Sequence, residues 1–354
     1  MHVVASTLSP LRPSTRFTLY RHSTTSLKRG NPHNLGVYTH ICYGDALKDL
    51  LVVGHLCIDF VAVGDEPPRM ALGGPPAYTS MAAASFGAST AIASVVGTDF
   101  PRDYIDRLSS AGVDLRWLSI SGSKSTSYLL SYARGERRLR LLARAPPITP
   151  DLLPREAFRS AHVSPVVGEV SLEVVKALRG RVEVLSLDPQ GFVRGFDDEG
   201  FVRGVSWPGR RFFGFVDVLK VSPEELRLAV GGAGLSRCLE EVHEAGVSVV
   251  LITLGSRGSL ASFSDGVYLV PACTPRRVVD ETGAGDAYMG AFLAHYVRGA
   301  GPLWCACVGS ASASLVVEAC GPVVVDGDEA LRRAENAYGR VRRLSPRDVD
   351  ALGF

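Results

Sequence analysis

The sequence lacks the marks of a secreted, membrane-spanning or polyanion-binding protein. Its seven cysteines are odd in number and form no CxxC pair, so we expect neither a disulfide framework nor a zinc site. It contains no apolar run of the length that spans a bilayer, about 18 residues or more. Its 38 basic and 36 acidic residues leave a net charge of only +2, which favours no nucleic-acid partner. We therefore expect a cytoplasmic globular protein with no membrane partner.

Acidic residues are absent from the first 44 positions, which are rich in serine, threonine and proline. The same stretch carries five basic residues, namely Arg12, Arg16, Arg21, Lys28 and Arg29. This composition is typical of an organelle transit peptide, but a disordered basic tail or a start codon placed too far upstream would also produce it. We favour an unstructured or spurious extension over residues 1–48, and we expect no chemistry from it.

From residue 51 the pattern changes to short, continuous apolar runs that are typical of parallel strands covered on both faces. These runs lie at 51–54, 91–96, 182–187, 216–221 and 248–254. Helical patterns lie between several of them, at 75–86, 101–111, 170–179 and 236–245. The alternation predicts an α/β fold, a doubly wound parallel sheet. We assign residues 49–345 to this domain and 346–354 to a C-terminal tail, and we expect ligands beyond the carboxyl ends of the strands.

One stretch departs from this alternation. Two strand-like runs, 126–132 and 137–143, are joined by a turn that contains glycine, which predicts a β-hairpin. The runs 58–63 and 69–72 could add strands beside it. A small inserted β layer, mainly within 58–73 and 120–145, suggests a lid over a ligand, although an ordinary surface hairpin would have the same pattern.

The most informative segment is Val279–Asp286, which has the sequence VDETGAGD and precedes an apolar helix. Gly283 and Gly285 permit close backbone approach at the start of that helix, where unpaired N–H groups and the helix dipole attract an anion. Asp286 falls in the first turn. It could be an ordinary stabilising acid at a helix start, or a carboxylate that takes a proton from an attacking hydroxyl beside a bound phosphate.

This segment resembles the signature of the ribokinase-like (PfkB-type) carbohydrate kinase family, which reads DTxGAGD before a helix. The resemblance extends in order over about residues 51–340 and implies a ribokinase-like fold. It implies that Asp286 is the catalytic base and that Gly283, Ala284 and Gly285 form an anion hole. It also implies a monovalent cation such as K⁺ near Asp280 and Thr282, although Glu281 between them departs from the family pattern.

A second match concerns the substrate side. Gly73 and Gly74 precede an alanine-rich helix, as in the family motif GGxxxN, and Tyr78 stands where the motif has asparagine. The resemblance also implies that Asp59, at the end of the run GHLCID, binds substrate hydroxyls. A carboxylate accepts hydrogen bonds from hydroxyls well. Without the resemblance, the two glycines and the residues after them would be interpreted as a turn followed by a core helix, and Asp59 as a turn residue. The run GHLCID and the aromatic residue at 78 resemble the inositol-kinase-type branch.

Two further matches concern the phosphate donor. The sequence SPEE at 222–225 resembles the family motif NxxE, which implies that Glu225 organises Mg²⁺ through water and that Ser222 replaces the usual asparagine. Alone, it is an ordinary helix start with a capping residue, a proline and acids. The sequence TLGSRG at 253–258 resembles the nucleotide loop TxGxxG, which implies that Thr253, Gly255 and Gly258 bring backbone N–H groups to ATP phosphates.

The stretch 188–191, DPQG, also follows a strand, but a turn explains it and we assign it no role.

These matches predict an ATP-dependent kinase that transfers the γ-phosphoryl group to a hydroxyl of a small sugar or polyol, with inositol as one candidate. Two alternatives stay open. A nucleoside kinase would share every motif, and a non-catalytic relative that binds a sugar or nucleotide would tolerate the replacements at Tyr78 and Ser222. Exposed lid strands can pair between subunits, so we also consider a homodimer.

Overall fold

The computed structural model of the chain describes residues 47–63, 67–133, 136–232 and 234–352. Our prediction for the basic N-terminal segment therefore lies outside the described residues, apart from its last two positions. The first strand, β1, runs from Lys48 to Val53, so the folded domain begins where the apolar pattern begins.

A ten-stranded sheet forms the centre of the domain. Seven neighbouring strands, from β13 to β5, are parallel, which confirms the predicted doubly wound α/β sheet. Three antiparallel strands extend one edge. In spatial order the strands are β16 (Arg342–Leu344), β15 (Gly266–Val270), β14 (Ser259–Phe263), β13 (Val249–Thr253), β12 (Val218–Val221), β9 (Val182–Leu187), β8 (Phe158–Val163), β1, β4 (Thr90–Val96) and β5 (Asp114–Ile120).

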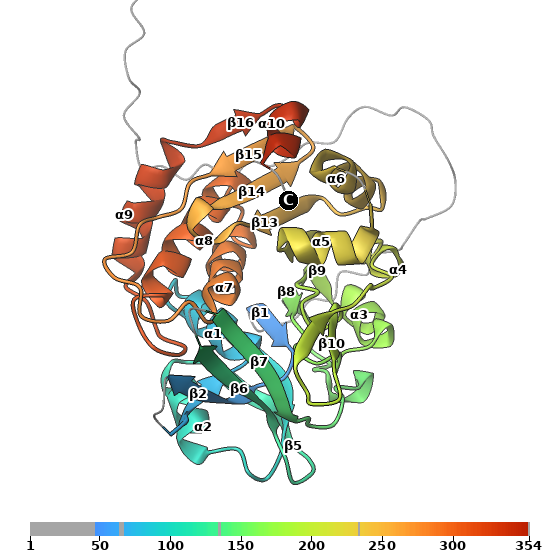
Figure 1. The fold of residues 1–354 in the computed structure, drawn as a ribbon, viewed down its shortest axis with the longest axis vertical. Coiled ribbons are helices and arrows are strands. Elements are labelled where there is room, and N and C mark those ends of the chain that lie inside the picture. The colour runs from blue at the N-terminus through green and yellow to red at the C-terminus, as the bar shows by residue number, and fades with distance from the viewer. Residues whose placement is uncertain (1–46, 64–66, 134–135, 233, 353–354) are drawn as a thin grey trace, which may run out of the picture. The chain divides into compact units, whose positions relative to one another are not determined.

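Helices cover both faces of this sheet because its strands are apolar on both sides (Figure 1). In β1, Leu50 and Val52 pack on one face, and Leu51 and Val53 pack on the other. The first face carries α1 (Pro75–Ala84), α7 (Ala284–Tyr296), α8 (Pro302–Val316) and α9 (Gly327–Tyr338), and α2 (Arg102–Ser110) packs near the β4 edge. The second face carries α3 (Leu172–Arg179), α4 (Arg210–Phe213), α5 (Pro223–Val230) and α6 (Leu235–Glu244).

A separate four-stranded sheet is built from the segments that we expected to form the inserted β layer (Figure 1). Its order is β3 (Arg69–Gly73), β2 (Cys57–Val63), β6 (Thr126–Ala133) and β7 (Glu136–Ala143). A short ribbon of two strands lies next to β7 and is joined to it by a bridge between Arg140 and Phe201. The strands of this ribbon are β10 (Arg194–Phe196) and β11 (Val202–Gly204).

The structure differs from the sequence-based expectation at its C-terminus and in several strands, which include β5 and the β10–β11 ribbon. The segment expected to be a C-terminal tail forms α10 (Pro346–Ala351), whose Val349 is buried in the core beside α6, so it belongs to the domain. Strand β8 was missed because Ser160 and His162 interrupt its apolar run, and both are buried and hydrogen-bonded inside the sheet. The antiparallel strands β14 to β16 were also missed. No helix in the described part of the chain is both long and apolar enough to cross a membrane.

Candidate active site

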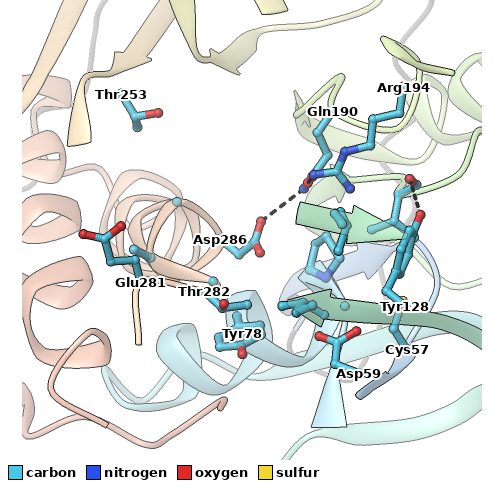
Figure 2. Close-up of a pocket in the computed structure, with 18 of the residues that line it drawn as sticks. Cys57, Asp59, Tyr78, Tyr128, Gln190, Arg194, Thr253, Glu281, Thr282 and Asp286 are labelled. Carbon is cyan, nitrogen blue, oxygen red and sulfur yellow. Dashed lines mark hydrogen bonds between the residues drawn. The ribbon is translucent and has the colours of Figure 1, made fainter. Parts of the chain in front are cut away.

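A cleft of about 270 Å³ opens beyond the carboxyl ends of β12 and β13, between the four-stranded sheet and the start of α7. It is bordered by side chains from β2, α1, β6, β7, β12 and β13, by the segment after β9 and by the loop before α7 (Figure 2). This is the position that a doubly wound sheet predicts for a ligand.

The start of α7 forms one wall of the cleft. Gly283 is the residue before the helix and has φ of +77°, a left-handed conformation that glycine adopts without strain. Gly283, Ala284 and Gly285 all border the cleft. The first turn of a helix leaves N–H groups without intrahelical partners, so this wall can bind an anion.

The side chain of Asp286 points into the cleft from the first turn of α7 (Figure 2). Its backbone oxygen accepts a hydrogen bond from Oγ1 of Thr79 at 3.1 Å, which joins α1 to the helix start. Desolvation at the bottom of this narrow cleft raises the pKa of Asp286 to about 7, although the cation of Lys220 opposes the shift. A carboxylate of that basicity can accept a proton from a hydroxyl near neutral pH.

A buried ion pair lies against the anion-binding wall, and its lysine borders the cleft. Nζ of Lys220, on β12, lies 2.6 Å from Oδ2 of Asp188, which follows β9, and neither side chain is more than 9% exposed. Burial alone would lower the pKa of Lys220, but the carboxylates of Asp188, Glu225 and Asp286 raise it above its ordinary value. A Cβ atom at Gly285 would lie 2.8 Å from Nζ, so this glycine lets the cation approach the helix start.

Neither residue of this pair was predicted to belong to the site. A usable signal existed, because Lys220 is the one charged residue within the apolar strand VLKV, and a buried charge in a central strand requires a partner. The turn at 188–191 had no predicted role either, yet Gln190 and the nearby Arg194 also border the cleft.

The residues predicted on the substrate side come together. Asp59 and Tyr78 border the cleft and are 8% and 4% exposed. The carboxylate of Asp59 occupies the space that a side chain at residue 73 would need, because a Cβ atom on Gly73 would lie 2.0 Å from Oδ2 of Asp59. Gly74 precedes α1 with φ of +89° and borders the cleft. The ring of Tyr78 packs against Gly283, so the two glycine motifs touch.

The wall below the four-stranded sheet is apolar. Cys57, Leu130, Leu139 and Val166 border the cleft there, together with the ring of Tyr128. The hydroxyl of Tyr128 donates to the backbone oxygen of Val166 at 2.8 Å, so its polar end is occupied and its ring faces the same apolar cluster. The cleft therefore has a charged half and an apolar half.

The predicted nucleotide loop lies at the other end of the cleft. Thr253, at the end of β13, borders it. Gly255 has φ of +60° in an exposed turn, and Gly258 has φ of +96° with room for no side chain, because a Cβ atom would lie 2.2 Å from the oxygen of Val270. A second hollow of about 390 Å³ borders the same loop at Ser256 and is also lined by Arg257, Pro271, Cys273, Arg340 and Arg342.

Ser222 and Glu225 form the capping box that their helix-start pattern predicts. The Ser222 amide donates to Oε2 of Glu225 at 2.7 Å, and the Glu225 amide donates to Oγ of Ser222 at 3.2 Å. Glu225 does not border the cleft, but desolvation and the charge of Asp188 raise its pKa. No cluster of three or more histidine, cysteine or acidic side chains capable of holding a metal occurs within the described ranges. Mg²⁺ usually binds through one or two carboxylates, waters and substrate phosphates, and Glu225 would reach such an ion only through water, because it lies outside the cleft lining.

The loop before α7 fits a monovalent cation in part. Oγ1 of Thr282 is buried and has no hydrogen-bond partner among the residues that the structure describes, so it is suited to coordinate an ion. The carboxylate of Asp280, in contrast, accepts the Thr282 amide at 2.9 Å through Oδ1. Glu281, which stands between them and departs from the family pattern, is exposed and borders the cleft.

Comparisons with known proteins identify the family of the chain. The family model described as pfkB family carbohydrate kinase matches residues 47–182 and 196–324. A cytidine kinase of Thermococcus kodakarensis is 28% identical over 72% of this chain and 90% of its own length, and a nucleoside kinase of Methanothermobacter thermautotrophicus is 28% identical over 82% and 97%. A pyrophosphate-dependent kinase in the ribokinase family, complexed with a pyrophosphate analog and myo-inositol, has a similar fold, with a TM-score of 0.70 at 23% identity over 79% of this chain and 99% of the other. The chain therefore belongs to the pfkB family of carbohydrate kinases.

Proposed function

We propose that this protein is an ATP-dependent kinase that transfers the γ-phosphoryl group to a hydroxyl of a small sugar or polyol. One observation carries the proposal: the carboxylate of Asp286 lies at the start of α7 in a cleft that Asp59 borders on one side and Thr253 on the other. An acceptor hydroxyl near Asp59 and a donor phosphate near Thr253 would meet at the α7 start, which is the geometry that in-line transfer needs.

Asp286 acts as the general base in this proposal. It accepts the proton of the acceptor hydroxyl as the oxygen attacks the γ-phosphorus, and the bond to the β-phosphate oxygen breaks. Its raised pKa, about 7, makes the carboxylate a better proton acceptor than an ordinary aspartate while leaving it largely ionised above neutral pH.

The charge of the transferred group is balanced by the protein on two sides. The start of α7 borders the cleft at Gly283, Ala284 and Gly285, and Lys220 borders it as well. Such fixed positive groups stabilise developing negative charge most strongly where water is excluded. When bound, Mg²⁺ would offset the charge of the donor phosphates, with Glu225 holding its water and Thr282 suited to a nearby K⁺.

The four-stranded sheet acts as a lid in this proposal. Its apolar inner wall, which includes Leu130 and Leu139, covers the acceptor half of the cleft. Excluding water there strengthens the electrostatic interactions and limits hydrolysis of ATP. The hollow beside the loop at 255–258, lined by Arg257 and Arg340 among others, would take the rest of the nucleotide.

A nucleoside is the second candidate acceptor, and the apolar wall favours it. Hydroxyls of a polyol such as inositol would lie unpaired against Cys57, Leu139 and Val166, whereas the flat faces of a base would not. The ribose hydroxyls of a nucleoside could still reach Asp59 and Asp286. The names of the cytidine kinase and nucleoside kinase relatives agree with this candidate.

A substrate screen on the full chain tests the function. The purified protein is incubated with ATP and Mg²⁺, and in parallel with pyrophosphate, against myo-inositol, ribose, fructose, cytidine and adenosine. We expect acceptor-dependent ATP consumption that Asp286→Asn abolishes. Thermal stabilisation by an acceptor and ATP without turnover would contradict the kinase proposal and favour a non-catalytic binding protein.

We also propose a homodimer through the lid. Strand β3 lies at the edge of the four-stranded sheet, pairs with β2 on one side, and presents Met70 with 53% of its surface exposed. An exposed edge with an apolar residue can pair with the same edge of a second copy. Light scattering should give a dimer mass that Met70→Lys reduces to that of a monomer.

A further inference from the structure

The segment after β9 carries two side chains that approach the carboxylate of Asp286. Nε2 of Gln190 donates toward Oδ1 of Asp286 at 3.4 Å, and Nη2 of Arg194 donates to Oε1 of Gln190 at 2.7 Å (Figure 2). Because Oε1 of Gln190 accepts from Arg194, Nε2 lies on the opposite side of the amide, 3.4 Å from Oγ of Ser164 and 3.4 Å from Oδ1 of Asp286. Arg194 thus fixes the orientation of the group that contacts the base.

The same segment is attached to the lid. Arg194 begins β10, and the turn of the β10–β11 ribbon bonds to β7: the Leu141 amide donates to the oxygen of Gly200 at 2.8 Å, and Nε of Arg140 donates to the oxygen of Glu199 at 2.6 Å. The ring of Phe201 lies under the guanidinium groups of Arg138, at 4.2 Å, and Arg140, at 5.8 Å. Moving β7 would therefore move the ribbon that carries Arg194.

The position of Arg194 also matters electrostatically. Its charge lowers the pKa of Asp286, although desolvation and the charge of Lys220 are larger influences. The other charged or titratable groups facing Asp286 come from several elements: Asp188 after β9, Glu225 on α5, Tyr78 on α1, and Cys57 and Asp59 on β2. Of the two cations, Lys220 is held by Asp188 inside the sheet, whereas Arg194 is held by a ribbon bonded to the lid.

We propose that Gln190 and Arg194 are positioning residues that orient the carboxylate of Asp286, and that the lid strand β7 holds them in place through the β10–β11 ribbon. This inference rests on the proposed function, in which Asp286 is the general base. In this arrangement the base is fully aligned only when the lid is seated, so proton transfer is tied to closure over the acceptor. Misplacement of a reacting group by about 1 Å can slow a reaction about 100-fold.

Steady-state kinetics test this pair of positioning residues, Gln190 and Arg194, which we call the arm. We expect Gln190→Met and Arg194→Gln to lower kcat by about 10-fold with the KM for ATP nearly unchanged, and to move the acid limb of the pH–rate profile to higher pH. Arg194→Lys should restore the acid limb, because it keeps the positive charge. It should not restore the full kcat, because lysine lacks the planar guanidinium group. Arg203→Gln, an exposed arginine on the same ribbon, is the matched control and should change neither quantity. Unchanged kcat in both arm variants would overturn the proposal.

A titration that needs no turnover separates this inference from the proposed function. In full-length protein with ¹³C-labelled aspartate carboxyls, the Asp286 signal is assigned by its loss in Asp286→Asn. Its midpoint should rise in Arg194→Gln and in Gln190→Met and stay constant in Arg203→Gln. An unmoved midpoint would refute the arm even if the enzyme is active, and a moved one supports it even if no acceptor is phosphorylated.

The link to the lid is tested by a double-mutant cycle. Phe201→Ala removes the ring beneath Arg138 and Arg140 and should lower kcat several-fold in the otherwise native chain. If the lid acts through the arm, the same change should have no further effect in the Gln190→Met background. Independent, additive effects would show that the ribbon does not transmit the lid position to the base. Where no acceptor is turned over, the Asp286 titration midpoint replaces kcat in the cycle.

Discussion

The ring of Tyr78 lies so close to the α-carbon of Gly283 that a methyl group added to the glycine would be 2.1 Å from Cδ1 of the ring. The substrate-side motif and the anion-binding helix start are therefore in direct contact, although they are far apart in the chain. Tyr78 replaces the asparagine of the family pattern, and its position explains part of that change. The aromatic ring fills the space above the glycine and also borders the acceptor half of the cleft.

This contact predicts that Gly283→Ala is disruptive. The added methyl group meets the Tyr78 ring and the backbone has φ of +77°, so we expect a loss of about 1–3 kcal/mol in the free energy of unfolding and a large loss of kcat. Urea unfolding measures the first quantity. Gly87→Ala is the matched control, because Gly87 has φ of +69° with no atom within 4 Å of the added carbon. It should lose only the part of the unfolding free energy that comes from the strained backbone conformation.

Removing the base should abolish turnover and leave the fold intact. Asp286→Asn is expected to lower kcat by at least about 100-fold, since general-base catalysis typically contributes that much. Asp103→Asn changes an ordinary acid in the first turn of α2 and should leave the rate unchanged. If both variants behave alike, Asp286 is only a helix-start acid, and circular dichroism would establish that neither has unfolded.

The raised pKa of Asp286 predicts the pH dependence of activity. Because only the ionised carboxylate accepts a proton, kcat/KM should fall as the pH drops through about 7, well above the range of an ordinary aspartate. A pH–rate profile at constant ionic strength measures this limb. A limb below about pH 5 would contradict the desolvated position of the carboxylate.

The same pKa shift predicts a gain of stability in Asp286→Asn at high pH. The folded state binds the Asp286 proton more tightly than the unfolded state, so the native stability from this group is present at low pH and is lost as the pH rises toward and through 7. Asparagine resembles the protonated form at every pH. We expect similar Tm values near pH 4 and a Tm at least about 2 °C higher for the variant at pH 8. Equal Tm values at both pH values would count against the shift.

Removing only one partner of the buried ion pair should lower the stability of the protein strongly. Lys220→Met leaves Asp188 charged and without its partner inside the sheet, and we expect a loss of about 3–5 kcal/mol in the free energy of unfolding. The double variant Lys220→Met/Asp188→Asn should recover part of that stability but not the activity. Chemical denaturation of the three proteins measures this, and recovery of activity in the double variant would remove Lys220 from phosphate stabilisation.

Local patterns were sufficient for the main architecture. The run VEVLSL predicted β9 at its observed bounds, because valine and leucine dominate it although Glu183 and Ser186 are polar. The glycines before α7 and the acid in its first turn were also visible, because backbone conformation and helix ends depend on neighbouring residues. Strand β8 was missed because its buried Ser160 and His162 find partners only in other strands.

The sequence by itself determined the α/β alternation, the glycine-rich start of α7 and the position of Asp286 within it, since each depends on residues close in the chain. Only the tertiary structure decided that Lys220 pairs with Asp188, that Tyr78 covers Gly283, and that Gln190 reaches Asp286. Each of these contacts joins residues separated by at least 32 positions. Such contacts follow from how the strands and helices pack, and no local pattern of side chains specifies them.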